Sequence, residues 1–257
     1  MWPFNKKKQI PAAIGTEITS IICIPGSWDS WEEFVVKIFG VTNGEYIVAG
    51  SILLNIKSNR SYAIEFCERD EKMMETFRNA GLVNNLSESF LEEIHLHKYV
   101  IYISGVTGDL ESAGHISGAA LMILNTGGIG IKIETAGKAF SKEQWINLAG
   151  KKTDQDYYQM FVIDSIINEG GEVYSCGMHN LGLMDTKVTG EDFQDAVCLI
   201  KVFNYYQVID KPSIQNNQTF RADTESPIFK ITEELNQPYK GLERFENPFG
   251  MWKLERI

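Results

Sequence analysis

Apolar residues occur along the chain in short runs that end at a glycine, a proline or a polar cluster. The run at 18–24 stops at Pro25 and Gly26, which is typical of a buried strand followed by a turn. Ser30 and Glu33 then fit a capping box, so we expect a helix to begin there.

Further along, hydrophobic spacing predicts strands at 46–56 and 61–67, helices at 71–80 and 87–94, and a strand at 99–104. The resulting βαββαβ order is that of a ferredoxin-like (split βαβ) unit. We therefore expect such a unit over residues 16–105.

The second half of the chain repeats these elements. Its spacing predicts, in chain order, a helix at 109–125, a strand at 129–134, a helix opened by Ser141 and Gln144, strands at 159–166, 172–176 and 181–188, and a helix capped by Thr189. We expect a second ferredoxin-like unit over residues 106–210. The predicted fold class is α+β, with mixed or antiparallel sheets and helices packed on one face. The pattern leaves open whether the halves share one sheet or form two.

The two ends of the chain differ from this pattern. Residues 1–15 are expected to be an N-terminal arm. Residues 211–257 contain prolines at 212, 227, 238 and 248, which break any long element. This tail still carries seven large apolar side chains, and burying each one stabilises a fold by about 1.5–3 kcal/mol. We expect an irregular extension packed on the core, ending in a strand near 251–254.

No apolar run approaches the roughly 20 residues that cross a bilayer, so no membrane association is expected. The lysines at positions 6–8 are followed by no apolar core or cleavage site, which argues against a secretory signal. Four cysteines lie far apart in the chain and are expected to be reduced. These features predict a soluble, cytoplasmic protein, either a monomer or a weak homodimer.

The formal net charge of -10 argues against nucleic-acid binding, which needs clustered basic residues. Residues 154–195 contain nine acids and one base, so most of the imbalance lies there. Acids that share an exposed face would steer a basic protein partner, whereas acids that solvate separate faces would not, and the sequence leaves both possible. The predicted partner-binding residues are Asp154, Asp156, Glu169, Glu172, Asp185, Glu191, Asp192 and Asp195.

No segment carries a complete catalytic, cofactor-binding or metal-binding signature. Residues 105–108 join a strand to a helix, a place where backbone amides can bind a phosphate. Asp109 lies at the start of that helix and would repel such an anion, so no phosphate site is expected. Thiol and imidazole groups lie three residues apart at Cys176 and His179, without a known signature around them. The alternative reading is therefore a pocket, in a small-molecule-binding protein or hydrolase-type enzyme, near His115, Glu134, Lys138, Cys176 and His179.

One central stretch resembles a known family. The motifs are the strand at 100–104, the helix with Gly118-Ala119-Ala120, the turn at 127–130, and then Ile133-Glu134, Gly137-Lys138 and Trp145, followed by Ser175, Gly177-Met178 and Gly182. They resemble the bacterial domain-of-unknown-function 4261 family over about the central half of the chain. The resemblance implies a small cytoplasmic bacterial module, in some cases an accessory or immunity protein encoded beside a toxin, and it lends no catalytic residue.

The leading hypothesis is a non-enzymatic protein-binding module, specifically an immunity protein that covers the active surface of a basic toxin. An acidic inhibitor would mimic the polyanion on which such a toxin acts. The small-molecule pocket is the alternative. A third reading, a structural subunit of a larger assembly, predicts an exposed apolar patch and self-association.

Overall fold

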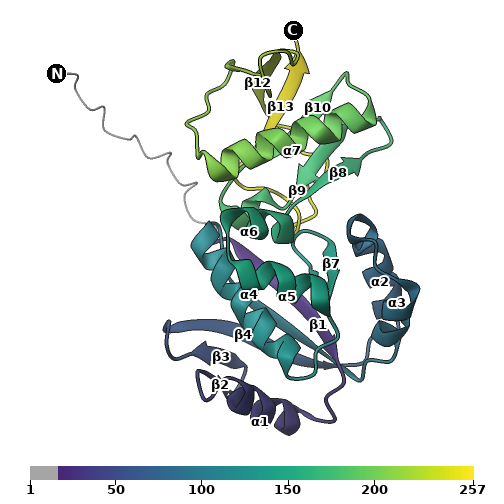
Figure 1. Ribbon diagram of the computed structural model, residues 1–257, viewed down its shortest axis with the longest axis vertical. Helices are drawn as coiled ribbons and strands as arrows, with labels where there is room; N and C mark the ends of the chain where they lie inside the picture. The colour runs from purple at the N-terminus through teal and green to yellow at the C-terminus, as the bar shows by residue number, and fades with distance from the viewer. Residues whose placement is uncertain (1–16) are drawn as a thin grey trace, which may run out of the picture.

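A computed structural model of the protein describes residues 17–257 and contains two separate β-sheets (Figure 1). The α+β class and the mixed or antiparallel character of the sheets are confirmed. The N-terminal arm predicted for residues 1–15 lies outside the described residues. Within 17–257, no helix is both long and apolar enough to cross a membrane.

The first sheet has seven strands, and every neighbouring pair is antiparallel. Its spatial order is β2 (Tyr46–Ala49), β3 (Ile52–Asn55), β4 (Arg60–Glu68), β5 (Tyr99–Val106), β1 (Thr19–Gly26), β6 (Gly130–Ile133) and β7 (Lys138–Ser141). Strand β1 pairs with β5 along its whole length, from Thr19 opposite Val106 to Gly26 opposite Tyr99.

Helices cover both faces of this sheet, so the prediction of helices on one face is wrong here. Successive residues of a strand point to opposite faces. Ile22 and Ile24 of β1 therefore join one buried cluster, while Cys23 joins another. Helices α1 (Trp31–Val41), α4 (Leu110–Asn125) and α5 (Lys142–Lys151) pack on the first face, and α2 (Met73–Ala80) and α3 (Glu88–His95) pack on the second.

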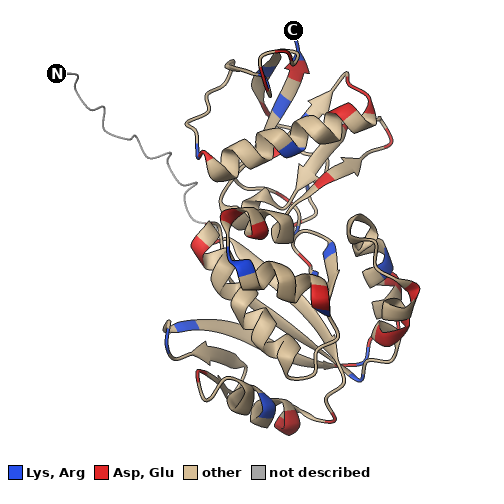
Figure 2. Cartoon of the chain, viewed as in Figure 1, with Lys and Arg blue, Asp and Glu red and all other residues tan. Residues whose placement is uncertain are grey.

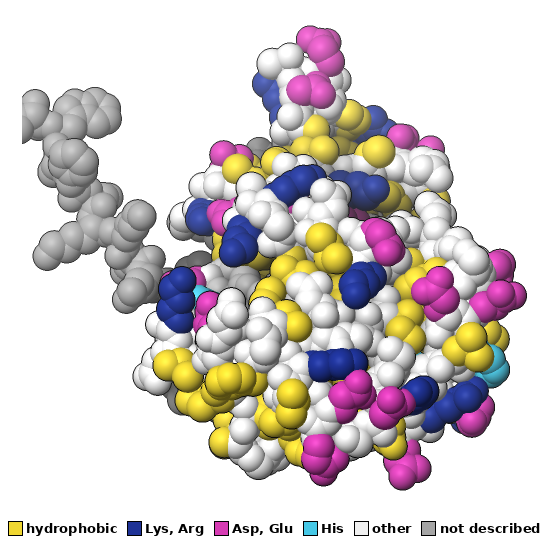
Figure 3. Space-filling model, turned by 60° about the horizontal axis from the view of Figure 1, so that its bottom comes forward, with side chains coloured by type: hydrophobic (Ala, Val, Ile, Leu, Met, Phe, Trp, Pro, Cys, Tyr) yellow, Lys and Arg dark blue, Asp and Glu magenta, His cyan; other side chains and the backbone are white. Residues whose placement is uncertain are grey.

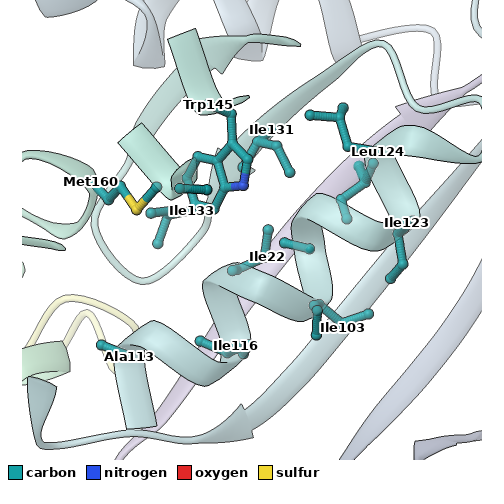
Figure 4. Packing of buried hydrophobic residues seen from close by; sticks show 14 of the residues in the cluster. Ile22, Ile103, Ala113, Ile116, Ile123, Leu124, Ile131, Ile133, Trp145 and Met160 are labelled. Atoms are coloured by element: carbon teal, nitrogen blue, oxygen red, sulfur yellow. The ribbon is translucent and has the colours of Figure 1, made fainter. Parts of the chain in front are cut away.

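Trp145 of α5 is fully buried in the larger of these clusters. Its indole lies beside Ile131 and Ile133 of β6 (Figure 4) and packs edge-on against Phe140 of β7, with the ring centroids 5.4 Å apart. Since an aromatic pair of this kind adds to the stability gained from buried area, α5 is fixed firmly over the edge of the sheet.

The second sheet has six strands in the order β11 (Thr219–Phe220), β12 (Phe229–Glu234), β13 (Met251–Arg256), β10 (Asp185–Thr189), β9 (Val173–Cys176) and β8 (Ile163–Ile167). Only β10 and β13 are parallel. Helix α7 (Phe193–Ile209) covers one face, as Figure 1 shows, and Tyr239 and Phe245 pack on the other. The predicted final strand is confirmed as β13. The tail is more than a wrap, because it supplies three of the six strands.

The pair of ferredoxin-like units is not confirmed. Strand β5 lies between β4 and β1, and strands from both sides of residue 105 share the first sheet. The second sheet begins only at β8, so the predicted division between 105 and 106 is not where the two sheets separate.

Three local predictions also differ from the structure. Residues 46–56 form two strands that turn at Gly50 and Ser51, rather than one. Helix α6 (Asp154–Phe161) occupies the start of the strand predicted at 159–166, because Thr153 and Asp156 form a reciprocal capping box. Helix α7 is capped by Asp192 instead of Thr189.

The two sheets meet at the short 3-10 helix η2 (Met178–Leu181). Asn180 accepts hydrogen bonds from Ser20 of β1 at 2.5 Å and from Thr135 at 2.9 Å. At Gly177 the backbone has φ +111°, and an added Cβ would lie 2.0 Å from the Phe161 carbonyl oxygen. Only glycine permits this approach, which places η2 directly against the end of α6.

Candidate functional site

The eight acids predicted to bind a partner do not form one exposed surface. Asp156 and Asp185 are buried, with exposed fractions of 5% and 0%. Asp156 belongs to the capping box of α6. Asp185 accepts hydrogen bonds from the Tyr239 hydroxyl and the Asn247 amide, both at 2.7 Å.

Most of the others are engaged by nearby groups. Salt bridges join Asp154 to Lys211 at 3.1 Å, Glu172 to Lys187 at 2.7 Å, and Glu191 to Arg256 at 3.6 Å. Asp192 caps α7, Asp195 lies in its first turn, and Glu169 is exposed between β8 and β9. Figure 2 also shows acids of other segments at the lower end of the molecule, and basic side chains lie among acids on the face in Figure 3. The eight acids therefore do not act together as one exposed docking surface, and partner binding through the exposed ones stays a prediction.

The five residues of the alternative pocket are also not brought together. The His115 imidazole is 3.6 Å from the Glu111 carboxylate, and Glu134 pairs with Lys132 at 2.9 Å and with Arg244 at 3.4 Å. No hydrogen bond between described residues joins Cys176 to His179.

Cys176 and His179 are both buried. Burial raises the pKa of the Cys176 thiol and lowers the pKa of His179 to about 4. Neither group is thus primed for nucleophilic or general-base chemistry at neutral pH. Over residues 17–257, no group of three or more His, Cys, Asp or Glu side chains is placed to hold a metal ion.

The fifth residue, Lys138, lines a different hollow, which we call the Lys138 cleft. Its volume is about 580 Å³. It lies where β7, the last strand of the first sheet, approaches β8, the last strand of the second. Its principal lining residues are Lys138, Phe140, Tyr158, Asp164, Lys201 and Tyr205.

Local structure explains how these residues meet. A turn at Gly137, with φ +67°, starts β7 at Lys138. Helix α6 carries Tyr158 and ends beside β8, which carries Asp164. Helix α7 brings Lys201 and Tyr205, which are four residues apart and therefore share one helix face.

The Lys138 amine is buried without an acidic partner. Its Nζ donates hydrogen bonds to the carbonyl oxygens of Gln159 at 2.5 Å and Val162 at 2.7 Å, at the end of α6, and lies 5.6 Å from the centre of the Phe140 ring. Burial lowers the pKa of Lys138 to about 8, and the nearby Asp164 charge offsets only part of that effect. A substantial fraction of this amine is therefore neutral near pH 8.

Asp164 is also buried and only partly satisfied. Its Oδ1 accepts a hydrogen bond from the Asn204 amide at 2.9 Å. Burial raises the pKa of Asp164, although Asn204 and Tyr158 nearby oppose that shift. The Tyr158 hydroxyl lies close to this carboxyl group but makes no hydrogen bond of good geometry with any described residue. It is thus a buried polar group available to a ligand.

The chemistry of the cleft favours a small anion with an apolar body. Two lysines, Lys138 and Lys201, face a single carboxyl group, Asp164. Apolar walls are supplied by Phe140 and Val162. Pockets that combine apolar walls with a few converging polar groups are typical of small-molecule sites.

Comparisons with known proteins were made on the whole chain. No protein-family model, curated protein or solved structure matches it. The resemblance to the domain-of-unknown-function 4261 family and the immunity hypothesis therefore stay predictions.

Sequence reasoning named Lys138 but missed its neighbours. Tyr158 and Asp164 fell within or beside a segment predicted as strand, so α6 was not foreseen. The spacing of Lys201 and Tyr205 indicates a shared helix face. Nothing in that spacing shows that the face meets β7.

Proposed function

We propose that the protein binds a small anionic molecule in the Lys138 cleft. The observation that carries this proposal is the convergence of Lys138, Lys201 and Asp164, from three separate elements, on one hollow between the two sheet edges. Fold stability does not require such a convergence, because burying an amine and a carboxyl group costs free energy.

The size and polarity of the cleft support the proposal. Its volume of about 580 Å³ falls inside the range of roughly 300–1,000 Å³ that is usual for small-molecule sites. Lys201 is exposed and can meet the anionic group of an entering ligand, while Lys138 and the Tyr158 hydroxyl are buried deeper. Apolar contact with Phe140 would then stabilise the ligand body.

A ligand screen tests the proposal. Small carboxylates and phosphate esters, each with an uncharged analogue, are added to the whole chain and the thermal midpoint is measured. A ligand at about 100 times its dissociation constant stabilises the fold by about 2.7 kcal/mol, which shifts the midpoint by several degrees. We expect an anionic compound to give this shift in the wild type and a much smaller one in Lys201→Ala.

Lys230→Ala is the matched control. Lys230 is an exposed lysine on β12, away from the cleft, so its loss changes the net charge equally and leaves the site intact. Equal loss of the shift in both variants would show that only overall charge matters. Absence of any shift across the screen would remove the proposal.

A further inference from the structure

The hydrogen bonds of Lys138 satisfy every N–H group of a neutral amine but only two of the three N–H groups of an ammonium ion. A neutral amine has two N–H bonds and one lone pair, whereas an ammonium has three N–H bonds. Two carbonyl acceptors, those of Gln159 and Val162, contact the nitrogen, and no third acceptor is found among residues 17–257. The neutral form satisfies both N–H groups and leaves its lone pair without a protein partner.

The surroundings of the amine make its neutral form accessible near pH 8. Among the described residues, no carboxylate lies within salt-bridge distance of Lys138. The titratable groups that face it are Asp164 on β8, which favours the charged form, and Lys201 on α7, which opposes it. Both also line the cleft. A desolvated lysine of this kind is the usual nucleophile towards carbonyl compounds.

We propose that the Lys138 amine condenses reversibly with the carbonyl group of a small anionic aldehyde or 2-oxo acid bound in the cleft, forming an imine. This inference rests on the proposed function and specifies the class of its ligand. Lys201 would hold the carboxylate or phosphate of the ligand, while the carbonyl carbon lies next to Lys138.

The condensation balances without an oxidant or reductant. The nitrogen lone pair attacks the carbonyl carbon, a C–N bond forms, and the carbonyl oxygen takes up a proton. Loss of water then breaks the C–O bond, and the two protons that leave the amine depart with that oxygen. The product of this step is a neutral imine without an N–H. Uptake of one proton from solvent gives the protonated imine, whose N–H can donate to one of the two backbone carbonyls. Asp164 is placed to carry protons in these steps, since its raised pKa suits a proton exchanger.

Two other described lysines, one buried and one in the same cleft, lack this combination. Lys187 is buried but pairs with Glu172 and Glu234, which hold it as an ammonium. Lys201 is exposed at the mouth of the cleft, where water solvates its charge. The inference therefore distinguishes Lys138 from both of these lysines.

Reductive trapping tests the inference. The whole chain is incubated with pyruvate and sodium cyanoborohydride at pH 8, and the modified lysines are mapped by peptide mass spectrometry. We expect Lys138 to be modified about tenfold or more faster than Lys230, because a nucleophilic amine must be neutral to react. Acetone, which lacks the anionic group, is expected to react more slowly at Lys138, and Lys201→Ala is expected to reduce that difference.

A control variant keeps the result interpretable. Lys138→Arg keeps N–H donors for the two carbonyls and cannot form the imine. An unchanged thermal midpoint without an adduct in this variant would separate the loss of chemistry from a loss of folding. Modification of exposed lysines at the same rate as Lys138, or none at Lys138, would overturn the inference. If pyruvate then still shifts the midpoint, reversible anion binding stands without the imine; if it and every other anion fail to do so, the proposed function falls as well.

Discussion

Lys187 in the second sheet and Lys138 in the cleft are both buried, but they differ in their hydrogen-bond partners and in the direction of their pKa shifts. Lys187 on β10 bonds to Glu172 at 2.7 Å and to Glu234 at 3.2 Å. Burial lowers the pKa of Lys187, but those two carboxylates outweigh it, so the pKa is raised overall. Lys138 has only carbonyl partners, and its pKa falls to about 8.

The buried acids of the same two regions show the same contrast. Asp185, beneath the C-terminal tail, accepts from Tyr239, Asn247, Ser175 and the Met178 backbone amide. Asp164, in the cleft, accepts one hydrogen bond of good geometry, from Asn204. Fully paired groups in the second sheet hold the tail in place, whereas incompletely paired groups in the cleft remain available to a ligand.

The largest expected effect is the loss of the Asp185 carboxylate. Asp185→Ala would leave four buried donors without an acceptor, at about 1 kcal/mol each, and should lower the free energy of unfolding by about 4 kcal/mol. Asp164→Ala leaves one donor, the Asn204 amide, without its acceptor and should lower the free energy of unfolding by about 1 kcal/mol. Urea denaturation measures both, and equal losses would contradict the contrast between the regions.

The next effect is a pH dependence at Asp185. Burial raises the pKa of Asp185 to about 6, although its hydrogen bonds oppose this, from an ordinary value of 3.8. Its contribution to stability is thus fully present below pH 3.8 and is lost as the pH rises through 6. Relative to Asp185→Asn, which does not titrate, the wild type should lose about 2.4 kcal/mol between pH 4 and pH 7.5. A difference that stays constant with pH would refute the assignment.

A smaller effect is expected when the paired lysine is removed. Lys187→Met leaves Glu172 and Glu234 without their shared cation in a partly buried place. We expect a loss of about 2 kcal/mol, less than for a fully enclosed pair because Glu172 still meets solvent. Denaturation at 50 mM and 500 mM salt checks this, since a partly buried pair is screened only weakly. A wild type and variant of equal stability would argue that the pairing does not hold the sheet.

The smallest change in stability should follow substitution in the cleft. Lys138→Met removes two hydrogen bonds, which destabilises the fold, and it also removes the free-energy cost of burying an amine, which stabilises it. The free energy of unfolding should therefore fall by about 1 kcal/mol or less. The same variant should lose most of the thermal shift given by an anionic ligand. A large loss of stability would instead assign Lys138 a purely structural role at the end of α6.

The elements themselves were largely predictable because their signals are local. The caps at Ser30 and Ser141 and the final strand near 251–254 follow from neighbouring residues alone. Strand order was not predictable in this way, since the placement of β5 beside β1 depends on contacts far apart in sequence. Helix α6 was missed because the apolar run at 160–163 outweighed the Thr153–Asp156 capping box.

The site was less predictable than the fold. Counting charge over 154–195 did not reveal that Asp156 and Asp185 are buried or that Glu172 and Glu191 are paired. Lys138 was named for a pocket with Cys176 and His179, and the strand that carries it was not foreseen. A buried lysine becomes recognisable only when its partners are known, and these come from other elements.

The most direct test of the account is the titration of individual lysine amines, followed by NMR of the side-chain carbon and nitrogen nuclei. We expect the Lys138 amine to titrate near pH 8 and the Lys187 amine above the ordinary lysine value of 10.5. Lys138 titrating at or above that ordinary value would show that the cleft holds a stable ammonium, and the central contrast between the two regions would be wrong.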